Sequence, residues 1–173
     1  LSIGLQSFDQ HQLDWMNRQH SAHDAAAAVQ LASEAGFEHI SADLIYGLPN
    51  RTMPFGHELQ RFVELPVDHL SAYILTVEDR TVLGKHVERG VQSIPEDRDV
   101  EGEYRALCAA MAEAGFEHYE VSNWAKQGGR AVHNQHYWSG FPYWGIGPGA
   151  HGFDGANRYA NVSNNPRYLQ ALE

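Results

Sequence analysis

The heptapeptide EAGFEHI at residues 34–40 returns almost unchanged as EAGFEHY at residues 113–119. In both places a helix-favouring stretch leads into a glycine, the residue that most often ends a helix in the left-handed conformation. The phenylalanine after each glycine opens a strand-like run. The repeat therefore indicates a fold built from recurring units in which a helix is followed by a strand.

Around this repeat, strand-like and helix-like stretches alternate. Strands are expected over 1–6, 37–46, 67–77 and 116–122, helices over 9–16, 21–35, 54–64 and 96–114, and an excursion of little periodicity over 80–95. Such alternation builds a parallel sheet covered by helices, and a closed barrel of eight such units needs about 250 residues. We predict an α/β fold, with a partial parallel (βα) barrel over residues 1–122 and a loop-rich C-terminal segment over residues 123–173.

Composition argues against nucleic-acid binding and against a membrane span. The 22 acidic and 12 basic side chains give a net charge of −10, which repels phosphate backbones and argues against nucleic-acid binding. No apolar run reaches the ~20 residues that cross a bilayer, and the first residues lack a secretion signal. We expect a soluble, cytoplasmic protein. Because the chain opens on Leu1, inside its first strand, we also expect that preceding residues are missing.

Metal binding has few sequence signals. Cys108 is the single cysteine, so no internal disulfide and no cysteine-only metal cage can form within one chain. It lies among helix formers, where a small buried apolar role is expected. The pairs His20 and His23, and His133 and His136, have plausible zinc spacing, but neither matches the H-E-x-x-H pattern. A zinc hydrolase is the weakest of the functional hypotheses.

Polar side chains stand near the ends of the first two predicted strands, where parallel α/β folds place their active sites. Gln6 follows the first strand, and Asp43 lies near the end of the second, between Ala42 and Leu44. An ionised Asp43 in apolar surroundings needs donors; ribose hydroxyls supply them in dinucleotide sites, and local backbone N–H groups do so equally well. Arg18 suits a carboxylate, although a surface ion pair or helix-end charge also explains it.

A second cluster, HNQHYW, occupies residues 133–138. Its imidazoles, amides and rings suit a flat aromatic ligand, because rings stack and a neutral imidazole ligates iron. From composition alone, an amphipathic strand with Tyr137 or Trp138 in the core is the simpler interpretation. The glycine-rich run at 145–151 misses the phosphate-loop spacing, and a tight loop explains it equally well.

Several segments, taken in order, resemble successive blocks of the oxygen-independent coproporphyrinogen oxidase family of radical S-adenosylmethionine (SAM) proteins. The blocks are IGLQSFD (3–9), NRQHS (17–21), DLIYGLP (43–49), DHLSAY (68–73), YEVSNWA (119–125), HNQHYW (133–138) and GIGPGAH (145–151). Their common order and their span of nearly the whole chain make the resemblance specific. It implies that the partial barrel is of the radical SAM type.

That family has two branches. Oxidases decarboxylate two propionates of coproporphyrinogen III to give protoporphyrinogen IX, and HemW-type haem chaperones bind haem and pass it to an acceptor protein. The pattern H-N-x-x-Y-W resembles the chaperone branch, which implies that His133 contacts haem, with Tyr137 and Trp138 as stacking walls and His136 at a variable position. We expect a haem chaperone, with coproporphyrinogen III oxidase as the alternative; whether the protein is an enzyme stays open.

The resemblance also implies SAM contacts: Gln6 to the polar groups, Arg18 to the methionyl carboxylate and Asp43 to the ribose hydroxyls. The chain departs from the family at Asn50 and Arg51, where Gly-Gln is usual. It also lacks the C-x-x-x-C-x-x-C loop that holds the [4Fe-4S] cluster through thiolates. We therefore expect no cluster ligand within these residues, and no radical generation by this chain alone.

Overall fold

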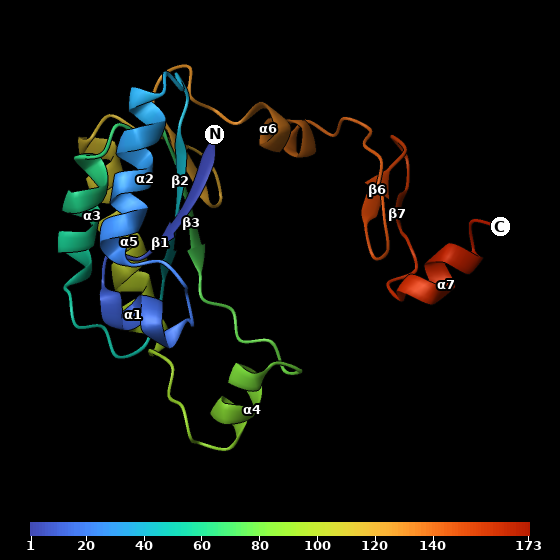
Figure 1. Cartoon of the computed structure of the whole chain (residues 1–173), viewed down its shortest axis with the longest axis horizontal. Helices are drawn as coiled ribbons and strands as arrows, with labels where there is room; N and C mark the ends of the chain where they lie inside the picture. Colours follow the sequence, from blue (N-terminus) through green and yellow to red (C-terminus); the bar gives the residue numbers. More distant parts are fainter. The chain divides into compact units, whose positions relative to one another are not determined.

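The computed structural model describes residues 1–173, which form two compact units, Leu1–Arg130 and Ala131–Glu173 (Figure 1). The first unit contains β1 (Ser2–Gln6), α1 (Gln10–Trp15), α2 (Ala22–Glu34), β2 (Ser41–Tyr46), α3 (Phe55–Val63), β3 (His69–Ile74), α4 (Val82–Glu88), α5 (Asp97–Glu113), β4 (Glu117–Glu120) and β5 (Asn123–Ala125). The second contains α6 (Val132–Trp138), β6 (His151–Phe153), β7 (Arg158–Ala160) and α7 (Asn165–Gln170). None of the helices combines the length and apolar character that a membrane span requires.

The first unit is built on a five-stranded sheet with the strand order β1-β2-β3-β5-β4. β1, β2 and β3 are parallel, whereas β5 is antiparallel to both β3 and β4. β4 therefore runs in the same direction as the first three strands. The predicted α/β arrangement of parallel strands and covering helices is confirmed, with one additional antiparallel strand inserted next to β3.

Helices α2, α3 and α5 cover one face of this sheet (Figure 1). Because successive strand residues point to opposite faces, alternate side chains of each strand enter the helical layer. Leu5, Leu44, Leu70 and Trp124 come from four different strands and are at most 2 % exposed. Trp124 also stacks on His118, with ring centroids 4.2 Å apart. The core of the first unit therefore lies between the sheet and these three helices.

The repeated heptapeptide ends two of those helices in the same way. Gly36 after α2 and Gly115 after α5 have φ values of 89° and 78°, which a residue with a Cβ adopts only at a cost. The following amides, of Phe37 and Phe116, bond back to carbonyls inside the preceding helix. The predicted helix end is confirmed in both copies, although the strand after α2 begins only at Ser41.

Two segments of the first unit differ from the expectation. The excursion at 80–95 contains α4, a short helix capped by Thr81, whose hydroxyl accepts from the Gly84 amide at 3.0 Å. A helix this short leaves almost no periodic signal in the sequence. Residues 123–125, assigned to the loop-rich tail, form β5 because Trp124 pairs with Leu70 in the sheet and buries its ring. The two units accordingly divide after Arg130, not after Ser122.

In the second unit, β6 and β7 form a hairpin that the sequence did not predict. The glycine-rich run before it is a tight loop, in which Gly147 and Gly149 have φ values of 101° and 70°. The Asn161 amide donates to the carbonyls of Gly145 and Gly147, each at 2.9 Å. These bonds support the interpretation of residues 145–151 as a turn that needs glycine for its backbone.

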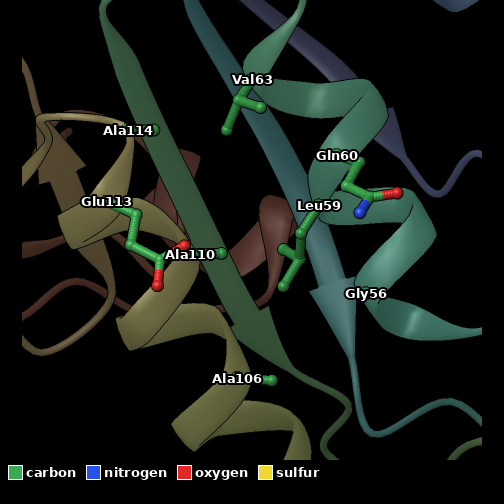
Figure 2. Close-up of a pocket in the computed structure, with 8 residues that line it drawn as sticks. All are labelled: Gly56, Leu59, Gln60, Val63, Ala106, Ala110, Glu113 and Ala114. Atoms are coloured by element: carbon green, nitrogen blue, oxygen red, sulfur yellow. The ribbon is translucent and has the colours of Figure 1, made fainter.

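A groove of about 370 Å³ runs between α3 and α5 (Figure 2). Small residues form much of its lining, including Gly56, Ala106, Ala110 and Ala114, with Leu59 at its floor. Since α3 and α5 cover the helical face of the sheet, this groove lies on the side opposite Asp43 and Ser71. It is therefore separate from the candidate site described below.

Truncating the central strand tests the assigned core. Leu70→Ala should lower the free energy of unfolding by about 2–5 kcal/mol, because the fully buried side chain leaves a cavity. The matched control is Leu31→Ala on α2, where the side chain is 63 % exposed and a change within about 0.5 kcal/mol is expected. Urea unfolding measures both; equal losses would mean that β3 does not form the centre of the core.

Candidate functional site

The face of the sheet opposite the helices carries polar side chains. Asp43, Ser71 and Asn123 are neighbours in register across β2, β3 and β5. On the other side of Asp43, its register partner is Gly4. Gln6 ends β1 with φ at 69°, and its side chain turns back over Gly4, where a Cβ would stand 2.5 Å from Gln6 Nε2. Gly4 thus leaves room for the Gln6 amide on the strand next to Asp43.

Asp43 lies in the middle of β2, in more polar surroundings than its neighbours in the sequence suggested. Its carboxylate accepts hydrogen bonds from the hydroxyls of Ser71 and Ser2, the latter at 3.5 Å. Burial raises the pKa of Asp43, and the two hydroxyls and His69 oppose that rise without cancelling it. A carboxylate has about four acceptor positions, so Asp43 retains capacity for further donors such as ribose hydroxyls.

His69 belongs to the same polar face and was not singled out from the sequence. It is 4 % exposed, and both ring nitrogens are paired: Nδ1 lies 2.7 Å from Ser41 Oγ and Nε2 lies 2.7 Å from the Tyr119 hydroxyl. Burial lowers the pKa of His69, with nearby carboxylates opposing the effect. The ring is thus favoured in its neutral form and braces β2, β3 and β4 beside Asp43.

Arg18 is positioned by the turn that ends α1. Asn17 has φ at 55°, its amide donates to Asp14 O at 2.9 Å, and the Arg18 amide donates to Leu13 O at 2.9 Å. These two bonds form a Schellman motif, with asparagine in the left-handed position that glycine usually takes. The turn fixes the Arg18 backbone, while the guanidinium makes no ion pair within the chain.

A cavity of about 580 Å³ opens where α1, β2 and β3 end. Arg18, Ile45 and Leu75 line it. Ile45 follows Asp43 by two residues and therefore points to the same face of the sheet. Gln6 and Asp43 do not line the cavity themselves, but they occupy this face on adjacent strands. The structure brings all three predicted SAM contacts to one side of the first unit.

A buried carboxylate holds the loop that follows β1. Glu58 on α3 is 1 % exposed and accepts from the Ser7 hydroxyl, from the Phe8 amide at 2.6 Å and from the Asp9 amide at 3.2 Å. Its other oxygen pairs with Arg51, in the loop after β2. Glu58 therefore ties together the loops that leave two adjacent strands.

The loop after β2 has further anchors. Arg51 also pairs with Glu103 on α5 at 3.0 Å, and Glu103 accepts from the Gly47 amide at 2.7 Å. Asn50 has φ at 54°; because asparagine and glycine tolerate this conformation best, the departure from the usual Gly-Gln keeps the turn. Arg51 replaces the glutamine with a side chain that links α3 to α5.

Asp9 also joins these two loops, because it lies in the loop after β1 and its carboxylate accepts from residues of the loop after β2. It caps α1 by accepting from the His11 amide at 3.0 Å, and it also accepts from the Thr52 amide at 2.6 Å and the Met53 amide at 2.8 Å. Although burial acts to raise it, these hydrogen bonds together with the Thr52 hydroxyl lower the pKa of Asp9. Asp9 is therefore the N-cap of α1, and the same carboxylate links this helix to the loop after β2.

The second candidate cluster lies on α6, a helix and not the amphipathic strand that composition favoured. His133 and Tyr137 share one side of it, with Tyr137 Oη 3.1 Å from His133 Nε2 and the two rings edge to face at 5.0 Å. Tyr143 packs against Tyr137 at 4.6 Å. Trp138, 61 % exposed, projects from a different side of the helix. His136 packs instead against Phe141.

The sequence did not single out Glu58 and His69, two residues that support the polar face and its loops. Each has a recognisable position in the sequence pattern of its helix or strand. Glu58 stands three residues after Phe55 and four before Phe62, so it falls within the apolar stripe of its helix. His69 alternates with Leu70 on a strand, which places it on the face opposite the core. Neither pattern reveals the partners, which come from distant parts of the chain.

No group of three or more His, Cys, Asp or Glu side chains is arranged to hold a metal ion. Cys108 lies on α5, packed against the core from the helical side of the sheet, and contributes nothing to the polar face. The residues of this chain thus do not fit a [4Fe-4S] cluster. The donors and acceptors of Gln6, Arg18 and Asp43 do suit the polar groups of SAM.

The fold is that of a solved radical SAM enzyme. The coproporphyrinogen III oxidase HemN from Escherichia coli superposes with a TM-score of 0.79 at 22 % sequence identity, over 99 % of this chain and 42 % of that chain. No protein-family model matches the sequence. The fold class is therefore confirmed as a partial barrel of the radical SAM type.

Sequence similarity narrows the class further. The chain is 41 % identical over 173 residues to the heme chaperone HemW of Mycobacterium tuberculosis and 35 % identical over 173 residues to the heme chaperone HemW of Bacillus subtilis. These matches cover 99 % of this chain but 44 % and 46 % of the relatives, so the chain spans less than half their length. The chain belongs to the HemN/HemW-type family of radical SAM proteins, which implies SAM and a [4Fe-4S] cluster as cofactors of the family.

Neutralising Asp43 should stabilise the fold. Because burial raises its pKa, the ionised carboxylate costs stability that is regained when the group is protonated. Asp43→Asn should therefore increase the free energy of unfolding at pH 7. The difference from the parent should shrink as the pH falls through the raised pKa toward the ordinary value of 3.8. Urea unfolding between pH 4 and pH 8 measures it; a loss of stability at pH 7 would contradict the assignment.

Proposed function

We propose that this chain belongs to a haem chaperone that also binds SAM and a [4Fe-4S] cluster. The observation that carries the proposal is the arrangement on α6, where the His133 imidazole stands beside Tyr137 on an exposed helix. A neutral imidazole is a common axial ligand of haem iron, and aromatic rings stack on a flat macrocycle. The HemW relatives, which are named as heme chaperones, support the same function.

The haem site is proposed to comprise His133, Tyr137 and Trp138. His133 Nε2 is engaged with the Tyr137 hydroxyl, so iron binding through that nitrogen exchanges a hydrogen bond for a metal bond. Tyr137 then offers a ring edge, and Trp138, more than half exposed, offers a second aromatic surface. His136 packs against Phe141 and is not part of the proposed site.

The SAM site is proposed to comprise Gln6, Arg18 and Asp43. Asp43 would accept from the ribose hydroxyls, the Gln6 amide would bond the other polar groups, and the Arg18 guanidinium would pair with the methionyl carboxylate. Gln6 and Asp43 lie on adjacent strands of the polar face, and Arg18 lines the cavity at the strand ends together with Ile45 of the same face. The cluster would be held by cysteines outside these 173 residues, and the protein would act in the cytoplasm and pass haem to an acceptor protein.

Removing the proposed axial ligand tests the haem site. His133→Ala should weaken haem binding about tenfold or more, since each 1.4 kcal/mol of lost interaction is a factor of about ten. The measurement is a haem titration followed by the Soret absorption band, and His136→Ala is the matched control on the same helix. Unchanged affinity of the His133 variant would contradict the assignment.

The oxidase alternative has its own test. If the protein were a coproporphyrinogen III oxidase, the reconstituted intact protein would form protoporphyrinogen IX from coproporphyrinogen III under anaerobic conditions. We expect no sustained formation of this product. Robust turnover would overturn the chaperone proposal.

A further inference from the structure

The cavity at the strand ends has a wall that the SAM contacts do not account for. Besides Arg18, Ile45 and Leu75, it is lined by Val82 and His86 of α4. Figure 1 shows α4 carried on two long connections at the same end of the first unit as α1. A segment of 16 residues, 80–95, thus lies between β3 and α5 and closes one side of the cavity.

Specific contacts hold α4 in this position. Gly84 packs against the backbone of Glu78, so closely that a Cβ would collide with the Glu78 carbonyl oxygen. After the helix, Gln92 accepts a hydrogen bond from the Trp15 indole at 3.3 Å. The first contact folds the segment on itself and the second attaches it to α1, so the wall is a built feature of the fold.

The cavity is lined by basic side chains and by no acidic ones. The chain has 22 acidic side chains, yet none of them lines the cavity, whereas Arg18 and His86 both do. Arg18 has no ion-pair partner within the chain. Val82 is 70 % exposed, so the wall offers an apolar surface in the same cavity as Arg18 and His86.

We propose that α4 recognises the ligand of this cavity, with His86 and Arg18 together binding a carboxylate of that ligand. The inference rests on the proposed function for its ligands, because each of them carries a carboxylate on a short carbon chain: SAM at its methionyl end and a tetrapyrrole at its propionates. The Arg18 fork can pair with both carboxylate oxygens and still leave acceptor positions free. His86 supplies a further N–H donor to one of them, and Val82 covers the carbon chain that carries the carboxylate.

The test uses two probes on the purified chain, S-adenosylhomocysteine and coproporphyrin III, each compared with its methyl ester. His86→Ala should weaken binding of one acid roughly tenfold or more, the usual contribution of a hydrogen bond to a charged group, and leave the affinity for its ester unchanged. Weaker binding of the first acid identifies the methionyl carboxylate, and weaker binding of the second identifies the propionate. The control is His23→Ala on α2, whose side chain is 91 % exposed and outside the cavity.

Variants of opposite charge at Val82 distinguish an effect on ligand binding from an effect on folding. Val82→Lys should tighten binding of the acid and Val82→Glu should weaken it, each about two- to fivefold, while circular dichroism stays the same. If the parent binds a probe and neither His86→Ala nor the Val82 pair changes its affinity, the inference is overturned. It is also overturned if the parent binds neither probe; haem binding that depends on His133 would then persist, so the two proposals fail separately.

Discussion

The site depends on a single buried carboxylate. Glu58 accepts hydrogen bonds from three consecutive residues of the loop after β1 and pairs with Arg51 of the loop after β2. Breaking such a buried pair typically costs about 3–5 kcal/mol, because the partner is left charged and unpaired. Gln6 immediately precedes one of these loops, and α1 with Arg18 follows it. The loop between Gln6 and α1, and with it the placement of the proposed SAM contacts Gln6 and Arg18, is therefore anchored on α3, on the helical side of the sheet.

The two faces of the sheet serve different purposes. The helical face is closed by Leu, Phe and Trp side chains and supplies most of the apolar burial. The opposite face holds Asp43 and His69, and burial disfavours the charged form of each. Keeping an ionisable carboxylate there costs stability, and this cost is expected at a functional position. The same face leads to the cavity where Arg18 and α4 meet.

Much of the first unit could be predicted from the sequence, because the repeated heptapeptide and the period of each helix are local signals. The order of the parallel strands follows from the connection rules. β5 could not be predicted, since its three residues are fixed by the pairing of Trp124 with Leu70 rather than by any local pattern. α4 and α6 are too short to show a period. The candidate residues Gln6, Arg18 and Asp43 were found by their places in the chain, whereas Glu58 acts through partners about 50 residues away.

Hydrogen–deuterium exchange on a Glu58→Gln variant tests the role of this carboxylate most directly. The amide side chain keeps the size of Glu58 but loses the charge that pairs with Arg51, and its NH₂ group faces donors where a carboxylate oxygen had accepted. We expect exchange to rise together at residues 7–9 and 47–53, while residues 69–74 of β3 stay protected. Faster exchange in only one of the two loops, or in neither, would show that Glu58 does not join them.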